Sequence, residues 1–255
     1  MNLVAVETLG KQRIHQQFIA RSRLDRTYRE GFWTYTTQRF FYLADFMHQN
    51  GLSDVFHLES DVMLYANIGE LLPHCQAHYA NMIAVPSDCD ARCIASFIYV
   101  ANVTPLDAFL QFVTDKVRDI DNDMHFLAHF RHRYFQVYID HFPVIFPDYA
   151  KDHALISRFG DVTATPERYM SYFDDFQAVF DAAAIGQYLG GIDPRNGESV
   201  PGFVNESTLF NVADFQYEWI ADEKGRKVPH MIYQGQKIKI NNLHIHSKRL
   251  DAFKS

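Results

Sequence analysis

Two acidic residues follow a short apolar run in the first quarter of the chain. Glu59 and Asp61 come directly after residues 55–58, Val-Phe-His-Leu, a run long enough for one buried strand. In extended backbone, residues two positions apart project to the same side, so both carboxylates can face one point. Carboxylate oxygens are hard ligands that suit Mg²⁺ or Mn²⁺. Such an ion can bind phosphate oxygens of a substrate at the same time. The pattern predicts a divalent metal site, and a polar strand exit is the alternative interpretation.

The sequence around this acidic pair resembles that of a known family. Residues 39–43, Arg-Phe-Phe-Tyr-Leu, and residues 55–63 resemble the helix and the metal-binding strand of GT-A fold glycosyltransferases. In that family an Asp-x-Asp signature ends a central strand and binds the metal and the diphosphate of a nucleotide sugar. Here Glu59 takes the first position, and Glu is also a hard carboxylate ligand. The resemblance implies an enzyme that moves a hexose from a nucleotide-diphosphate sugar to a saccharide or other hydroxyl acceptor.

The segment near the other end of the chain extends this resemblance. Residues 241–248 read Asn-Asn-Leu-His-Ile-His-Ser-Lys, and many GT-A enzymes supply a third metal ligand from a late His followed by a Lys that contacts phosphate. If the segment is extended, His244 and His246 lie on one face and either could reach the metal. We expect His246 to be the ligand and Lys248 to stabilise the leaving diphosphate. Two ordinary surface or core histidines are the alternative.

Four further acidic residues are candidates for sugar binding or acid–base catalysis. A glycine-rich helix end followed by Asp, Arg and Asn, at residues 180–196, is typical of a sugar-recognition loop. Asp181, Asp193 and the later Glu206 could bind hydroxyl groups or transfer protons, and Asp123 is a candidate on the acceptor side. An inverting enzyme would need one of them as general base, and a retaining enzyme would not need so evident a base. The sequence does not decide between the two outcomes. A helix end followed by turns is the alternative reading.

The elements that must position these residues follow from apolar periodicity. Helices are expected over residues 33–48, 104–117, 125–138 and 177–189. Strands are expected over residues 55–58, 94–100, 215–220, 228–233 and 236–245. The last three form a C-terminal antiparallel hairpin or meander, because turn residues separate them.

The fold expected from this order is α/β. The family resemblance implies a mixed, mostly parallel sheet flanked by helices, within a single glycosyltransferase-like domain over residues 1–255. Residues 1–30 have room for at most one strand, over residues 3–6, and a short helix. The N-terminal nucleobase-binding unit of the family is therefore expected to be shortened.

Composition limits the classes of function. The formal net charge of −7 gives no electrostatic support for nucleic-acid binding, and an acidic protein that handles phosphates would recruit a cation. No apolar run is long enough for a transmembrane helix. Three Cys residues imply no disulfide framework, which favours a reducing cytoplasm. The resemblance to GT-A glycosyltransferases implies a role in carbohydrate biosynthesis there.

Three other interpretations remain open. The chain could be a non-catalytic carbohydrate-binding relic of a transferase, or a metal-dependent hydrolase built on the same acidic pair. A zinc site could also be formed by the spaced pairs His74/His78 and Cys89/Cys93. The order and spacing of those four residues match no common zinc finger.

Overall fold

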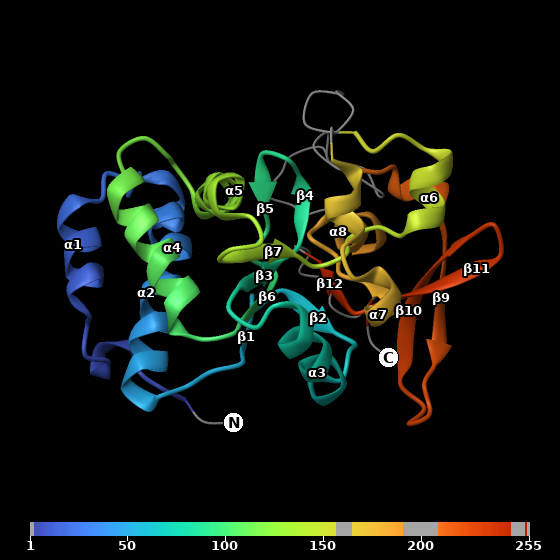
Figure 1. Ribbon diagram of the computed structural model, residues 1–255, viewed down its shortest axis with the longest axis horizontal. Coiled ribbons are helices and arrows are strands. Elements are labelled where there is room, and N and C mark those ends of the chain that lie inside the picture. Colours follow the sequence, from blue (N-terminus) through green and yellow to red (C-terminus); the bar gives the residue numbers. More distant parts are fainter. Residues whose placement is uncertain (1–2, 157–164, 191–208, 246–252, 254–255) are drawn as a thin grey trace. The chain divides into compact units, whose positions relative to one another are not determined.

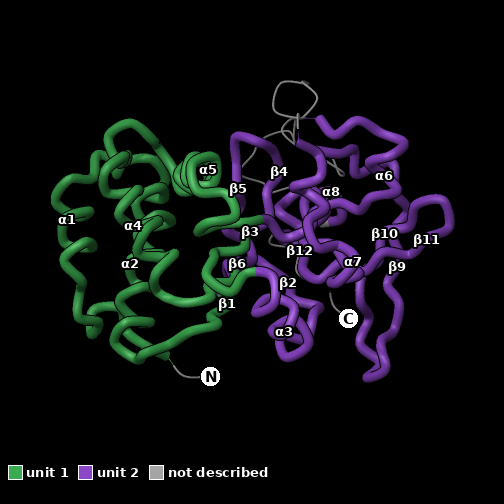
Figure 2. The backbone as a smooth tube through the Cα atoms, in the orientation of Figure 1, with its two compact units in different colours: residues 1–56, 79–84, 99–140 green, residues 57–78, 85–98, 141–255 purple. Residues whose placement is uncertain are grey.

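A computed structural model describes residues 3–156, 165–190, 209–245 and 253. Contacts within the chain cluster into two compact units, shown in Figure 2. Unit 1 comprises residues 1–56, 79–84 and 99–140, and unit 2 comprises residues 57–78, 85–98 and 141–255. In the described ranges, no helix combines the length and the apolar character needed to cross a membrane.

Unit 1 is built mainly from four helices (Figure 1): α1 (Arg13–Arg21), α2 (Phe32–Asn50), α4 (Val103–Lys116) and α5 (Asp123–Tyr134). Side-chain caps begin two of them, because Asn102 accepts the backbone N–H of Thr104 and Asn122 accepts that of His125. Helix α2 ends at Gly51, whose left-handed backbone stops the helix. Aromatic residues fill the space between the helices, with Phe18 stacked on Phe41.

Unit 2 contains an antiparallel meander near the C-terminal end. Its strands are β9 (Gln216–Ala221), β10 (Lys227–Tyr233) and β11 (Gln236–Ile240), and β8 (Ala178–Val179) adds to β11 in parallel. The β9–β10 turn is closed by Asp222, whose side chain accepts the backbone N–H groups of Lys224 and Arg226. The β10–β11 turn uses Gln234 and Gly235, both with positive φ. The predicted hairpin is therefore confirmed.

The remaining strands are short. Strands β1 (Val55–Leu58), β6 (Phe97–Val100), β3 (Ile83–Val85) and β7 (Ile139–His141) form a sheet in that order. Two further pairs are β2 (Val62–Leu64) with β12 (Asn242–His244), and β4 (Ser87–Cys89) with β5 (Arg92–Cys93). The other helices of unit 2 are α3 (Ile68–His78), α6 (Pro147–Asp152), α7 (Phe173–Phe176) and α8 (Ala184–Gly190). Short 3₁₀ turns occupy Val6–Thr8, Tyr28–Glu30, Pro166–Met170 and Val212–Asp214.

The fold is mixed α/β, as expected, and three of the four predicted helices correspond to α2, α4 and α5. Among strand pairs whose register is described, β8–β11 is parallel and the other five are antiparallel. Two expectations differ from the structure. The helix predicted over residues 177–189 begins only at Ala184, because residues 178–179 pair with β11. Residues 3–6 form no strand, and a 3₁₀ turn begins at Val6.

Candidate metal centre

The two acidic residues of the sequence motif lie in the tight connection between β1 and β2. The carbonyl oxygen of Glu59 accepts the backbone N–H of Val62 at 3.2 Å, which closes a turn over residues 59–62. The backbone N–H of Glu59 is held by Ser96 at 3.1 Å. A turn, and not extended backbone, therefore brings the carboxylates of Glu59 and Asp61 together. Both side chains are partly open to solvent, at 19% for Glu59 and 28% for Asp61.

The third residue of the site is His244, the last residue of β12. This strand pairs antiparallel with β2, and His244 lies opposite Val62, next to the acidic turn. Figure 1 shows β12 and β2 side by side. The Nε2 atom of His244 is 3.1 Å from Oε2 of Glu59 and 3.4 Å from Oδ1 of Asp61. One potential ligand atom from each residue lies within 4.8 Å of the other two, close enough for one metal ion to touch all three.

Hydrogen bonds fix the orientation of the His244 ring. Its Nδ1 atom lies 2.8 Å from the carbonyl oxygen of Ala182, which can only accept, so Nδ1 carries the proton. This bond directs Nε2 towards Glu59 and Asp61. A ring N–H bound to a backbone carbonyl is the usual outer-shell support of a metal-binding histidine, because it sets the tautomer.

Asp181 holds the backbone around His244. Its buried carboxylate accepts backbone N–H groups from Ile185 at 3.0 Å, Gly186 at 2.8 Å and His244 at 2.9 Å. Burial raises the pKa of Asp181 to about 6, although these backbone hydrogen bonds act in the opposite direction. The carbonyl oxygen of Asp181 also accepts the side chain of Asn242 at 2.9 Å. Asp181 was expected to bind hydroxyl groups or transfer protons, but in this structure it acts as a positioning residue.

The charge of the site is balanced by His244 itself. Burial acts to lower the pKa of His244, but hydrogen bonds to Asp61 and Glu59 and their negative charges outweigh it and raise the pKa to about 10. An imidazolium therefore lies between two carboxylates at neutral pH. A divalent cation placed there would take over this role, with His244 as a neutral ligand.

Of the other predicted site residues, the structure describes Asp181 and Asp123. Asp123 belongs to unit 1, where it begins α5 and forms an ion pair with Arg39 at 2.7 Å. The predicted residues Asp193, Glu206, His246 and Lys248 lie outside the described residues. His244 was one of the two expected histidine ligands, and its contacts place it at the acidic pair.

The alternative zinc site is not assembled. Among the described residues, Glu59, Asp61 and His244 form the only group of three or more potential ligands that converge. Cys89 and Cys93 are fully buried free thiols. His78 stacks on Tyr172 and contacts Asp175 at 3.0 Å.

Two residues that support the site were given no role in the sequence reasoning. Gly186, in the first turn of α8, lies against the backbone of His244, and Asn242 binds the carbonyl oxygen of Asp181. A glycine inside an expected helix was the available signal for Gly186, because such glycines often mark close packing.

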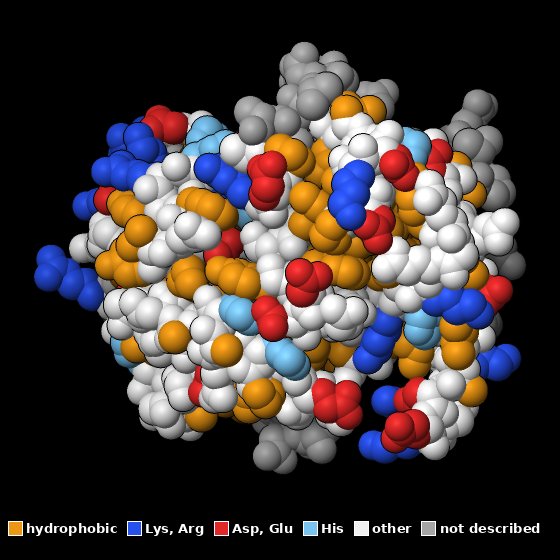
Figure 3. All heavy atoms as spheres, turned by 45° about the vertical axis from the view of Figure 1, so that its right-hand side comes forward, with side chains coloured by type: hydrophobic (Ala, Val, Ile, Leu, Met, Phe, Trp, Pro, Cys, Tyr) orange, Lys and Arg blue, Asp and Glu red, His pale blue; other side chains and the backbone are white. Residues whose placement is uncertain are grey.

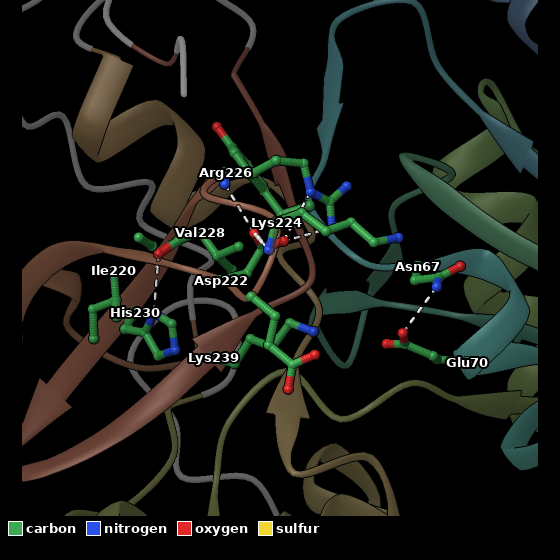
Figure 4. A pocket seen from close by; sticks show the side chains of 12 residues that line it. Asn67, Glu70, Ile220, Asp222, Lys224, Arg226, Val228, His230 and Lys239 are labelled. Atoms are coloured by element: carbon green, nitrogen blue, oxygen red, sulfur yellow. Dashed lines mark hydrogen bonds and ion pairs between the residues drawn. The ribbon is translucent and has the colours of Figure 1, made fainter.

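A pocket of about 340 Å³ lies elsewhere in unit 2. Figure 4 shows Asn67 and Glu70 on one side of it and residues of the β9–β10 hairpin on the other. Tyr65 also lines it, and β2 connects Tyr65 to the acidic turn. Amide, ammonium and carboxylate groups line this pocket, so its surface suits a polar ligand.

Comparison of the chain with known protein families, curated proteins and solved structures found no match.

Proposed function

We propose that the protein is a divalent-metal-dependent glycosyltransferase that moves a hexose from a nucleotide-diphosphate sugar to a saccharide or other hydroxyl acceptor. The observation that carries the proposal is the convergence of Glu59, Asp61 and His244, whose potential ligand atoms lie within 4.8 Å of one another. Glu59 and Asp61 come from the turn before β2 and His244 from β12, its antiparallel partner, so the histidine lies 183 positions after Asp61 in sequence.

The ligand set favours Mn²⁺ or Mg²⁺. Two carboxylates supply hard oxygen ligands, and one imidazole nitrogen favours a transition-metal ion such as Mn²⁺ over Mg²⁺. The carboxylates are partly exposed and His244 is buried, so the open side of the site lies over Glu59 and Asp61. Substrate oxygens can complete the coordination from that side.

The chemistry of sugar transfer requires positive charge at this position. A bound divalent cation would offset the charge that develops on the departing diphosphate. Glu59 and Asp61 hold the cation, His244 fixes its third contact, and Asp181 keeps His244 in place. Lys248, in the proposal, contacts the same diphosphate. A late histidine at the acidic pair is also the third ligand expected from the resemblance to GT-A enzymes, which supports this function over other metal chemistry.

Thermal unfolding with metal and nucleotide tests the proposal. Mn²⁺ together with a nucleoside diphosphate should raise Tm by about 5 °C or more at ligand concentrations near 100 times Kd. Asp61→Ala and His244→Ala should abolish the shift. Asp174→Ala, a change at an exposed acidic residue of the same unit, should keep it.

Product analysis distinguishes the other functions. A saccharide acceptor should receive a hexose only when metal and nucleotide sugar are both present. Saccharide binding with no effect of nucleotide would contradict the proposal and indicate a carbohydrate-binding protein. Steady release of free sugar or phosphate without acceptor would contradict it in favour of a hydrolase.

A further inference from the structure

Positive charge is concentrated in one short segment of this acidic protein. Residues 11–35 contain six Lys and Arg residues and two acidic residues, Asp25 and Glu30, which gives a net charge of +4. The remaining 230 residues contain 18 basic and 29 acidic residues, a net charge of −11. The segment forms α1, the connection to α2 and the start of α2, all in unit 1.

The folded structure exposes these cations. Helix α1 buries His15 and Phe18, which turns its arginines outwards. The exposed members are Arg13, Arg21, Arg23, Arg26 and Arg29. Within the part of the chain that the structure describes, no ion pair joins any of these five to an acidic residue. Lys and Arg side chains gather along the left margin of Figure 3, over unit 1.

Acidic residues nearby are engaged in local contacts. The carboxylate of Asp25 accepts the backbone N–H groups of Thr27 and Tyr28. Asp119 lies 3.8 Å from the ammonium group of Lys116, and Asp121 lies 3.0 Å from the ring of His125. The arginines of the segment can therefore attract an anion from outside the protein.

Exposed apolar side chains accompany the cations. Four of the ten exposed large hydrophobic residues among the described residues lie within residues 11–35. Tyr35 is 66% exposed, and Ile19, Tyr28 and Phe32 are each about 40% exposed. Trp33 stacks on Tyr28 and meets Phe32 edge to face, so these rings form one ordered cluster. A hollow of about 470 Å³ opens beside them, and its charged lining mixes Arg23 and Arg118 with Asp25, Asp119 and Asp121.

We propose that the surface formed by residues 11–35 docks on a membrane rich in anionic lipid. Arginines bind the negatively charged lipid headgroups, and each cation near such a surface adds to the attraction. Aromatic rings and Ile19 enter the boundary between headgroups and acyl chains, where amphipathic aromatic side chains are favoured. A single-stranded nucleic acid could use the cations and stack its bases on the exposed rings, but it would leave the aliphatic side chain of Ile19 in water. The membrane therefore accounts for both features of the surface, and the inference does not depend on the transferase activity.

Sedimentation with lipid vesicles tests the docking. The full chain should bind vesicles of phosphatidylcholine and phosphatidylserine about 10-fold or more tightly than vesicles of phosphatidylcholine alone. Arg21→Glu with Arg23→Glu should weaken this binding about 10-fold or more. Lys224→Glu with Lys227→Glu, an equal change of charge at exposed residues of unit 2, should leave binding within about twofold.

A second variant separates the apolar contribution from charge. Phe32→Ser with Tyr35→Ser should weaken vesicle binding most clearly at high salt, where electrostatic attraction is screened. Circular dichroism and unfolding midpoints must match those of the unchanged protein for each variant used. Equal effects of the two charge-reversal pairs, or no preference for phosphatidylserine, would overturn the proposal. The proposal would also be overturned if the protein bound a single-stranded oligonucleotide through Arg21 and Arg23 but did not bind vesicles.

Discussion

Gly186 of α8 lies directly against the backbone of His244. A Cβ atom at Gly186 would be 2.3 Å from the carbonyl oxygen of His244 and 2.8 Å from Oδ2 of Asp181. The first turn of α8 therefore meets β12 at the level of the main chain. The position of the histidine in the metal centre depends on this contact, because Asp181 binds both segments.

Replacement of this glycine should disturb the metal site. Gly186→Ala forces the backbone of His244 away, and we expect a loss of about 2–3 kcal/mol in the free energy of unfolding. Mn²⁺ affinity should fall about 10-fold or more, as for other losses of outer-shell support. Urea unfolding and calorimetric titration measure the two effects. Gly69→Ala is the matched control, because its nearest neighbour would be at an ordinary 3.4 Å. Unchanged metal affinity in Gly186→Ala would refute the positioning role.

Metal binding should compete with a proton on His244. Because the pKa of His244 is raised to about 10, its ring is protonated at neutral pH and must lose the proton to bind a metal. The apparent Kd for Mn²⁺ should therefore fall about 10-fold for each pH unit from about pH 6 to about pH 8. Titration calorimetry in two buffers of different ionisation enthalpy should show about one proton released per ion. A Kd independent of pH would argue against His244 as a ligand.

In the metal-free protein, the raised pKa of His244 should make stability fall as pH rises. A folded-state pKa above the unfolded value stabilises the fold below about pH 6.5, where both states are protonated. This contribution is lost as pH rises towards about 10. Unfolding midpoints measured in the presence of a chelator should fall over that range, and His244→Ala should reduce the fall.

Two His–Asp pairs in unit 1 should differ in their contribution to stability. His15 and Asp45 are both buried, with Nδ1 and Oδ2 2.6 Å apart, and Asp45 also accepts the backbone N–H of Gln12. Asp45→Ala leaves these donors unpaired in the interior, and we expect a loss of about 3 kcal/mol. His48 and Asp107 form a comparable contact at 2.9 Å, but both are partly exposed. Asp107→Ala should cost less than about 1 kcal/mol in the same urea experiment. Similar losses for the two variants would contradict this ranking.

The three cysteines should be unreactive in the folded protein. Cys75, Cys89 and Cys93 are all free and buried. Burial and then the charge of Asp88 raise the pKa of Cys89 to about 11, so little thiolate forms near pH 8. Ellman's reagent at that pH should detect no rapidly reacting thiol in the native protein and three after denaturation. A fast reaction in the native state would show that one of these side chains is accessible.

Local sequence signals predicted much of the secondary structure. The helix over residues 33–48 carries an apolar stripe and a terminal glycine, and the structure shows it as α2 with Gly51 at its end. The C-terminal strands were marked by turn residues, and they form the predicted antiparallel hairpin. These features depend on neighbouring residues, which a single sequence shows directly.

Features set by distant contacts could not be predicted in the same way. The register of β12 on β2 aligns His244 with Val62 and so determines which histidine lies beside Glu59 and Asp61. The role of Asp181 depends on backbone N–H groups that converge only after α8 and β12 pack together. The acidic pair was recognised from its spacing, but a turn and not a strand brings its carboxylates together.

The pairing of β2 with β12 also determines when the metal centre can form during synthesis. A chain still growing on the ribosome has Glu59 and Asp61 exposed long before residue 244 has been translated. Until that strand arrives, the two carboxylates have no imidazole partner, and Leu64 and Val62 have no strand to pair with. Glu59, Asp61 and His244 can therefore converge only after residues 242–244 have folded onto β2, so the candidate site is completed late in folding.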